Sequence, residues 1–202
     1  MRILVVGATG TIGRAVAQAL SARHEVVAAS HAKTDLRVDI ASRQSIEGLF
    51  HSVGPVDAVV SAAGRAAFGP VLQLSDEDFQ LSLSNKLMGQ VNLVRLGARH
   101  VKDGGSFTLT SGVLAREPMP GSAAISLVNS GIEGFTLAAA LELPRGLRIN
   151  VVSPPWVSET LKAMGKDPSG GVPAAQVAHA YVQSVEGKAN GQVIDARAFA
   201  SR

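Results

Sequence analysis

The stretch that decides the fold is the apolar run Ile3-Leu4-Val5-Val6, followed directly by Gly7-Ala8-Thr9-Gly10-Thr11-Ile12-Gly13. The apolar run is typical of a strand buried on both faces, and the pattern from Arg14 to Leu20 is typical of a helix. In such a strand–turn–helix, Gly7 permits the tight turn and Gly10 lets the backbone approach a pyrophosphate. Gly13 lets the helix and the strand pack closely.

The N-terminus of this first helix would present free N–H groups and the positive end of the helix dipole to phosphates. A glycine turn between a buried strand and a helix favours dinucleotide binding over a tight turn that binds nothing. The sequence therefore predicts a dinucleotide site whose phosphate-binding residues are Gly7, Thr9, Gly10, Thr11, Ile12 and Gly13.

Short β-branched runs alternate with longer helical patterns along the rest of the chain, which indicates a parallel sheet flanked by helices. The expected strands span residues 2–6, 25–29, 57–60, 105–110, 147–152 and 191–195. The expected helices span residues 11–22, 42–52, 75–100, 121–143 and 173–186. The predicted class is α/β, with a Rossmann-like, doubly wound parallel sheet of six to seven strands in a single domain over residues 1–202.

Local signals set several boundaries. Ser75 before Asp76-Glu77-Asp78 predicts a helix N-cap with a negative first turn rather than a metal site. Lys102-Asp103-Gly104-Gly105 predicts a turn into the next strand, and Pro144 closes the helix over 121–143. Only eight residues separate Ser30 from Asp39. A parallel crossover with a helix needs more, so the sheet edge after the second strand is expected to be trimmed to a stub around Arg37-Val38 or absent.

Composition excludes several classes of function. The 202 residues contain no cysteine, so neither a disulfide scaffold nor thiolate chemistry is expected, and a cytoplasmic setting is favoured. No apolar run is long enough for a membrane span or a signal peptide. The net charge of +3 is scattered and aromatic residues make up 4%, which argues against nucleic-acid binding. The five histidines are not at metal-ligand spacing, so no metal site is expected.

The end of the second expected strand favours one form of dinucleotide. NAD sites place Asp or Glu there to bind the ribose 2′-hydroxyl. This chain has Ser30-His31-Ala32-Lys33 instead. A hydroxyl, an imidazole and an ammonium can bind a 2′-phosphate by charge-assisted hydrogen bonds. Ser30, His31 and Lys33 therefore favour NADP(H) over NAD(H), the alternative being that His31 and Lys33 are solvated loop residues.

Over nearly its whole length the sequence resembles the short-chain dehydrogenase/reductase family. The Gly7–Gly13 turn looks like the phosphate loop of that family, and Asp39-Ile40 resembles its adenine-contacting pair. Ser61-Ala62-Ala63-Gly64 resembles the segment beside the adenosine ribose. Residues 148–157 resemble the strand and loop that hold the nicotinamide carboxamide, which implies contacts from Pro154 and Val157. Pro155 replaces the usual glycine and stiffens this loop.

The catalytic positions depart from the family pattern. Family members use a Ser–Tyr–Lys group with a supporting Asn, in which the Tyr exchanges a proton while hydride moves. Alignment on Glu133-Gly134-Phe135 puts Ile125 at the Tyr position and Asn129 at the Lys position. The usual spacing puts Gly112 rather than Ser111 at the Ser position, and alignment on Gly89 puts Lys86 at the Asn position. The single tyrosine, Tyr181, lies in a late helix and is interpreted as a core or surface residue.

Three functions therefore remain in competition. The first is an NADP(H)-dependent oxidoreductase of a small carbonyl or alcohol substrate, acting through Lys86, Thr110, Ser111 or Asn129, where a desolvated Lys86 would have a lowered pKa. The second is a non-catalytic NADP(H)-binding protein, in which Lys86 is a solvated or phosphate-binding residue. The third, a nucleic-acid binder, is the weakest because no basic face is evident.

Two further expectations concern the substrate side and association. The segment from Ser158 to Val172 is short, polar and rich in glycine, which predicts a lid over the nicotinamide. The helix over residues 121–143 carries many small residues that allow close helix approach. The family resemblance implies a homodimer or homotetramer through this helix and the long one before it. The same small residues would alternatively pack against the sheet.

Overall fold

The computed structural model describes residues 1–200. Within them, seven parallel strands form one sheet in the order β3-β2-β1-β4-β5-β6-β7. The strands are β1 Arg2–Val6, β2 Glu25–Ser30, β3 Leu36–Arg37, β4 Val56–Ser61, β5 Val101–Thr110, β6 Arg148–Ser153 and β7 Val193–Asp195. The α-helices are α1 Thr11–Ser21, α2 Arg43–Val53, α3 Asp76–Leu81, α4 Met88–Gly97, α5 Ala123–Ala139, α6 Ser158–Ala163 and α7 Ala174–Glu186. The predicted α/β class and the Rossmann-like parallel sheet are confirmed.

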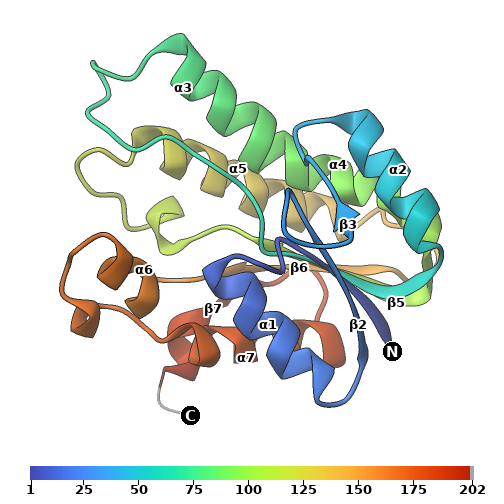
Figure 1. Ribbon diagram of the computed structural model, residues 1–202. Coiled ribbons are helices and arrows are strands. Elements are labelled where there is room, and N and C mark those ends of the chain that lie inside the picture. Colours follow the sequence, from blue (N-terminus) through green and yellow to red (C-terminus); the bar gives the residue numbers. More distant parts are fainter. Residues whose placement is uncertain (201–202) are drawn as a thin grey trace.

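Helices cover both faces of the sheet (Figure 1). Successive side chains of a strand point to opposite faces. Leu4 and Val6 of β1 therefore join one core with α2, α4 and α5. Ile3 and Val5 join a second core with α1 and α7. Because β1 is buried on both sides, its continuous apolar sequence is explained.

The trimmed edge is confirmed at β3, which has two residues and pairs with Ala29 and Ser30 of β2. The stub is Leu36–Arg37, one residue before the predicted position. The chain reaches it through a short loop in which Thr34 Oγ1 donates to the Leu36 carbonyl at 2.6 Å. A loop of this length has no room for a helix, so the sheet ends here.

The prediction of one continuous helix over residues 75–100 is wrong. The structure has α3, a π-helical turn over Ser82–Leu87, α4 and a 3₁₀ turn over Ala98–His100. A π turn adds one residue per turn and is frequent at functional sites. The Ser75 N-cap is confirmed, because its side chain accepts from the Asp78 N–H and the Asp78 carboxylate accepts from the Ser75 N–H.

Two other boundaries were also wrong. The turn predicted at Lys102–Gly105 lies inside β5, which starts at Val101, and the ladder with β4 is irregular there. Gly104 at φ +73° accommodates this bulge. The helix expected to run to Pro144 ends at Ala139, because the chain then passes through a turn that puts Arg145 at φ +57° and Gly146 at φ +67°.

Candidate active site

A cavity of about 560 Å³ opens beside the carboxyl ends of β1, β2 and β4. The strand order reverses between β1 and β4, which is the point where doubly wound sheets bind ligands. The predicted residues that line the cavity are Gly7, Thr9, Gly10, Ser30, His31, Asp39, Ile40, Ala62, Ala63 and Gly64. Thr11, Ile12, Gly13, Lys33 and Ser61 were predicted as well but are not among the lining residues.

The phosphate turn is shaped by its glycines. Gly7 has φ +86°, and a Cβ there would lie 2.7 Å from the Ala62 carbonyl oxygen. A Cβ on Gly13 would lie 2.0 Å from the Gly7 carbonyl oxygen, so the close packing expected at Gly13 is present. Both positions exclude any side chain while this backbone holds.

The N-terminus of α1 fits a phosphate group. Its N-cap is Gly10, which has no side chain to satisfy the first turn, and no acidic residue lies in that turn. Within the described chain, the N–H groups of Thr11, Ile12 and Gly13 have no backbone acceptor. Such free N–H groups at a helix start attract anions.

The end of β2 carries no carboxylate at the cavity. His31 is exposed and lines it, whereas Lys33 lies outside the lining. Ser30 is buried, and its hydroxyl accepts the Lys33 N–H at 3.0 Å and contacts Thr34 Oγ1 at 3.1 Å. Of the three residues predicted for a 2′-phosphate, His31 is the one that has its side chain free at the cavity.

Six lining residues were missed from the sequence, of which Val6, Val38, Ala41 and Leu81 are apolar and Arg65 and Asn85 are polar. Arg65 adds a cation to the cavity wall, and Asn85 Oδ1 accepts the Arg65 N–H at 2.7 Å. Asn85 thereby ties the loop after β4 to the π-helical turn. The available signal for Arg65 was its position directly after the predicted Ser61–Gly64 segment. Asp39, in contrast, directs its carboxylate to the Ala41 N–H at 3.0 Å.

A second, smaller cavity of about 130 Å³ is lined in part by Lys86, which lies against Gly64 of the first cavity. The four residues aligned with the catalytic positions of the resembled family, Lys86, Gly112, Ile125 and Asn129, all line it. Its other lining residues are Ser111, Val113, Leu114, Pro154, Pro155 and Trp156. The sequence alignment thus brought together residues from three separate segments that do meet in space.

Lys86 enters this cavity from the π-helical turn. Its Nζ donates to the Ser111 carbonyl at 3.1 Å. A Cβ on Gly64 would lie 2.9 Å from Lys86 Cγ, so that glycine leaves room for the lysine stem. Desolvation lowers the pKa of Lys86 from 10.5 to about 8. The ammonium has further protons to donate beyond the one given to Ser111.

Asn129 is buried at 1% exposure and lacks the partners that a buried amide normally has. Its Oδ1 has no hydrogen-bond partner within residues 1–200, and no acceptor is recorded there for its Nδ2. A Cβ on Gly112 would lie 3.0 Å from that Nδ2. An unsatisfied buried polar group costs about 1–3 kcal/mol, and for Oδ1 a hydrogen-bond donor in the cavity would offset this cost.

The other polar candidates are committed elsewhere. Ser111 Oγ donates to Glu133 Oε1 at 2.8 Å. Thr110 Oγ1 donates to the Ser61 carbonyl at 2.5 Å and contacts the Tyr181 hydroxyl at 2.7 Å. Tyr181 is fully buried in α7, where desolvation raises its pKa, so of the two alternatives, core or surface, the structure shows a core residue. Neither Ser111 nor Thr110 has a hydroxyl free for substrate.

Comparison with known proteins identifies the family. A family model described as "Enoyl-(Acyl carrier protein) reductase" matches residues 7–191. The chain belongs to the short-chain dehydrogenase/reductase family. A crystal structure of the protein lin1944 from Listeria innocua shares 41% identity with it, at a TM-score of 0.93 over 96% of this chain and 98% of that one.

Two further relatives carry names that bear on activity. Carbonyl reductase (NADPH) 2 of Sus scrofa is 30% identical over 184 residues, which are 82% of this chain and 74% of the pig protein. A small-chain dehydrogenase solved in complex with NADPH is 30% identical, with a TM-score of 0.85 over 96% of this chain and 95% of that one.

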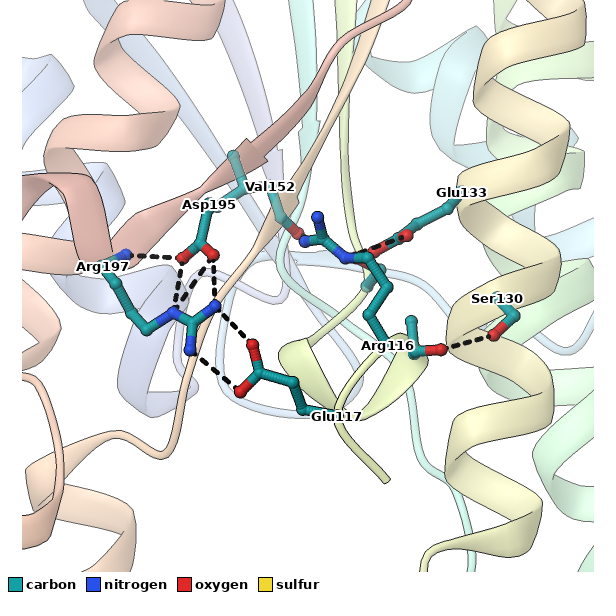
Figure 2. A network of polar contacts seen from close by, with 9 residues as sticks. Arg116, Glu117, Ser130, Glu133, Val152, Asp195 and Arg197 are labelled. Atoms are coloured by element: carbon teal, nitrogen blue, oxygen red, sulfur yellow. Dashed lines mark hydrogen bonds and ion pairs between the residues drawn. The ribbon is translucent and has the colours of Figure 1, made fainter. Parts of the chain in front are cut away.

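In this member of the family, a polar network braces the wall of the smaller cavity (Figure 2). Arg197 lies between Asp195 and Glu117 and donates to both carboxylates. Its hydrogen bonds hold the pKa of Asp195 below the usual value. Arg116 and Glu133 approach at 3.6 Å. The end of β7 is thereby tied to the loop that supplies Val113 and Leu114, a link that no sequence signal had indicated.

The predicted nicotinamide loop lines part of the same cavity, and the segment predicted as a lid follows it in the chain. Pro154 lines the cavity, while Val157 is buried and bridges to Val172. Between them the chain forms α6 and a 3₁₀ turn over Pro168–Gly170, and residues 162–170 are all exposed. Trp156 packs edge-on against Phe68, with ring centroids 6.4 Å apart.

No helix in the described part of the chain is long and apolar enough to cross a bilayer. Within residues 1–200, no three His, Cys, Asp or Glu side chains gather where they would hold a metal ion.

Proposed function

We propose that this short-chain dehydrogenase/reductase binds NADP(H) in the 560 Å³ cavity and reduces a small carbonyl compound in the 130 Å³ cavity beside it. The observation that carries the proposal is that Gly64, which lines the larger cavity, lies directly against Lys86, which lines the smaller one. The larger cavity is lined by Gly7, Thr9 and Gly10 of the glycine turn that leads into the free N–H groups of α1, and the smaller one by the residues at the family's catalytic positions. The NADPH bound in one relative and the NADPH-dependent carbonyl reductase named among the others support it.

Each part of the dinucleotide has residues that would hold it. The N–H groups of Thr11, Ile12 and Gly13 would bind the pyrophosphate. Asp39-Ile40 and Ser61–Gly64 would adjoin the adenosine, and His31 the 2′-phosphate, with Arg65 as a further cation. Pro154 and Val157 would hold the nicotinamide end. The bound cofactor supplies the hydride, and the protein orients substrate and excludes water.

The test is consumption of NADPH in the presence of a panel of small aldehydes, ketones and quinones. The proposal expects NADPH absorbance to fall with the appearance of an equal amount of alcohol or hydroquinone, and NADH to be used far less well. Tight NADPH binding with no turnover of any carbonyl would overturn the enzymatic proposal.

That outcome would favour the second candidate, a non-catalytic NADP(H)-binding protein. The observation behind it is Ile125, because an isoleucine at the Tyr position cannot exchange a proton. In that case the function would be binding of a partner protein, and bound cofactor would change the contacts with that partner.

We propose in addition that the chain forms a homodimer or homotetramer through α5. Leu127, Ser130, Gly134 and Leu137 recur at intervals of three and four residues in α5 and are all exposed. That spacing places them on one helix face, and a Cβ on Gly134 would meet nothing within 4 Å. Such a stripe of small and apolar residues allows two helices to approach closely.

Leu137→Arg should therefore weaken self-association. A charge buried at the centre of an interface costs about 2–4 kcal/mol, or roughly 30- to 1,000-fold in the dissociation constant. Sedimentation velocity over a range of concentrations measures this, with Leu72→Arg as the control because Leu72 is 96% exposed on a different segment. A wild-type protein that sediments as a monomer at all concentrations would contradict the proposal.

A further inference from the structure

The smaller cavity contains two nitrogen donors that the family's usual chemistry does not explain. Lys86 Nζ has one protein acceptor, the Ser111 carbonyl at 3.1 Å. Asn129 Nδ2 has none recorded within residues 1–200, although the residue is 99% buried and lines the cavity. When a carbonyl group is reduced, its oxygen needs hydrogen-bond donors aimed at it and a proton, and Ile125 provides neither.

Both donors lie against the same short piece of backbone. Lys86 Nζ bonds to the carbonyl of Ser111, and Asn129 Nδ2 lies 3.0 Å from where a Cβ of Gly112 would be. The amide of Asn129 therefore occupies space next to Gly112 that a serine side chain would need. A side chain at position 112 would crowd the present Asn129 amide, which would have to shift by a few tenths of an ångström, so the residues at these two positions affect each other.

The side chain of Lys86 packs against another glycine, Gly64. A Cβ on Gly64 would contact Lys86 Cα, Cβ and Cγ at 2.9–3.2 Å, so the lysine stem passes directly over the backbone of the loop after β4. Gly64 also lines the larger cavity. The lysine thus runs from the wall of the cofactor cavity into the substrate cavity, where its Nζ is desolvated.

We infer that Lys86 and Asn129 together bind the carbonyl oxygen of the substrate, and that Lys86 is its proton donor. This inference rests on the proposed carbonyl reductase function. The carbonyl carbon gains a hydride with its two electrons from NADPH, and the C=O π pair takes the proton from Lys86 Nζ. The carbonyl is reduced to an alcohol, NADPH is oxidised to NADP⁺, and the neutral amine of Lys86 regains a proton from water.

The cavity also limits the class of substrate. Besides Lys86 and Asn129, the cavity is lined by the apolar side chains of Leu114, Ile125 and Trp156. Ser111 also lines it but directs its hydroxyl to Glu133. The volume of the cavity is about 130 Å³. This shape suits a small, uncharged ketone, aldehyde or quinone with one oxygen at the two nitrogens and an apolar remainder.

A lysine that gives its proton at neutral pH must hold it less tightly than an exposed lysine. Desolvation alone lowers the pKa of Lys86 to about 8. The charged side chains on the adjoining segments are Arg65, Arg116, Glu133 and Lys166. Glu133 is paired with both Ser111 and Arg116. Lys166 lies over the Trp156 ring. None of these contributes to that shift.

The test compares Lys86→Met and Asn129→Leu with Lys188→Met, the same truncation at an exposed lysine. NADPH affinity measured by calorimetry should stay unchanged in all three. The kcat/KM for carbonyl reduction should fall about 10²- to 10⁴-fold for Lys86→Met and about 10²- to 10³-fold for Asn129→Leu. Reduction by the wild type should decline as pH rises through about 8, because the ammonium form is the acid.

Stability gives a readout that does not depend on activity. The unfolded chain binds a proton at Lys86 up to pH 10.5 while the folded chain releases it near 8, so the unfolding free energy of the wild type should rise relative to Lys86→Met across that window. Urea unfolding at a series of pH values measures the difference. A flat difference, or Lys86→Met with full kcat/KM, would overturn the inference and leave the proposed function standing. A wild type that reduces no carbonyl would overturn both.

Discussion

Gly13→Ala should lower the affinity for NADPH by about 100-fold or more. A Cβ on Gly13 would lie 2.0 Å from the carbonyl oxygen of Gly7, so α1 must move away from the turn that follows β1. That movement displaces the N–H groups of Thr11, Ile12 and Gly13, which have no other backbone acceptor. Each lost hydrogen bond to a charged group is worth about 1.5–3 kcal/mol, and two of them account for the expected change.

Calorimetric titration with NADPH measures this loss. The control is Gly48→Ala on α2, where a Cβ would meet nothing within 4 Å. This second variant exchanges glycine for alanine inside a helix without a clash, so it should gain up to about 1 kcal/mol of stability and bind NADPH as the wild type does. Equal affinity of Gly13→Ala and the wild type would show that phosphates do not bind at this helix start.

His31→Asp should reverse the choice of cofactor. His31 is the exposed side chain at the cavity end of β2, and this strand end carries no carboxylate. A carboxylate about 4 Å from a 2′-phosphate is repelled by about 4 kcal/mol at the effective dielectric of a protein surface. It would instead accept hydrogen bonds from the free ribose hydroxyl of NADH.

We expect NADPH affinity to fall about 100-fold or more in His31→Asp and NADH affinity to rise, measured by competitive titration of the two dinucleotides. His31→Asn has the same shape without the charge and should weaken NADPH only by the few-fold that one lost hydrogen bond accounts for. If His31→Asp keeps the wild-type preference, then the 2′-phosphate is bound elsewhere, with Arg65 as the remaining lining cation.

The fold was predictable from the sequence because its signals are local. Ile3–Val6 and the glycines that follow are a continuous segment, and at Gly7 and Gly13 the neighbouring backbone leaves no room for a Cβ. The trimmed edge at β3 follows from chain length alone. The start of β5 was missed because Gly104 and Gly105 look like a turn, whereas the glycines serve a bulge beside β4.

The candidate site was predictable only in part. Alignment brought Lys86, Gly112, Ile125 and Asn129 to one place, and they do line one cavity. Sequence spacing could not give the π-helical turn that carries Lys86, because such a turn depends on tertiary packing rather than on local propensity. Nor could it show that Ser111 turns to Glu133, a partner 22 residues away along the chain.

The replacement of the family's usual catalytic residues also explains why the sequence did not decide between an enzyme and a non-catalytic binding protein. Taken one at a time, Gly112 and Asn129 look like losses. In space they pack against each other, since the amide of Asn129 lies 3.0 Å from where a Cβ at position 112 would be. A loss of catalysis would leave the cavity free to fill with apolar side chains, yet a desolvated lysine and an unsatisfied amide remain in it.

The central claim is that the two adjoining cavities carry out hydride transfer to a carbonyl. The most direct measurement uses NADPH labelled with deuterium at the transferring C4 position and follows the label by mass spectrometry in the product of the best substrate in the carbonyl panel. The account predicts one deuterium on the carbinol carbon for each NADPH oxidised, with the transfer strongly reduced in Lys86→Met. Saturable NADPH binding with no label in any product would contradict it.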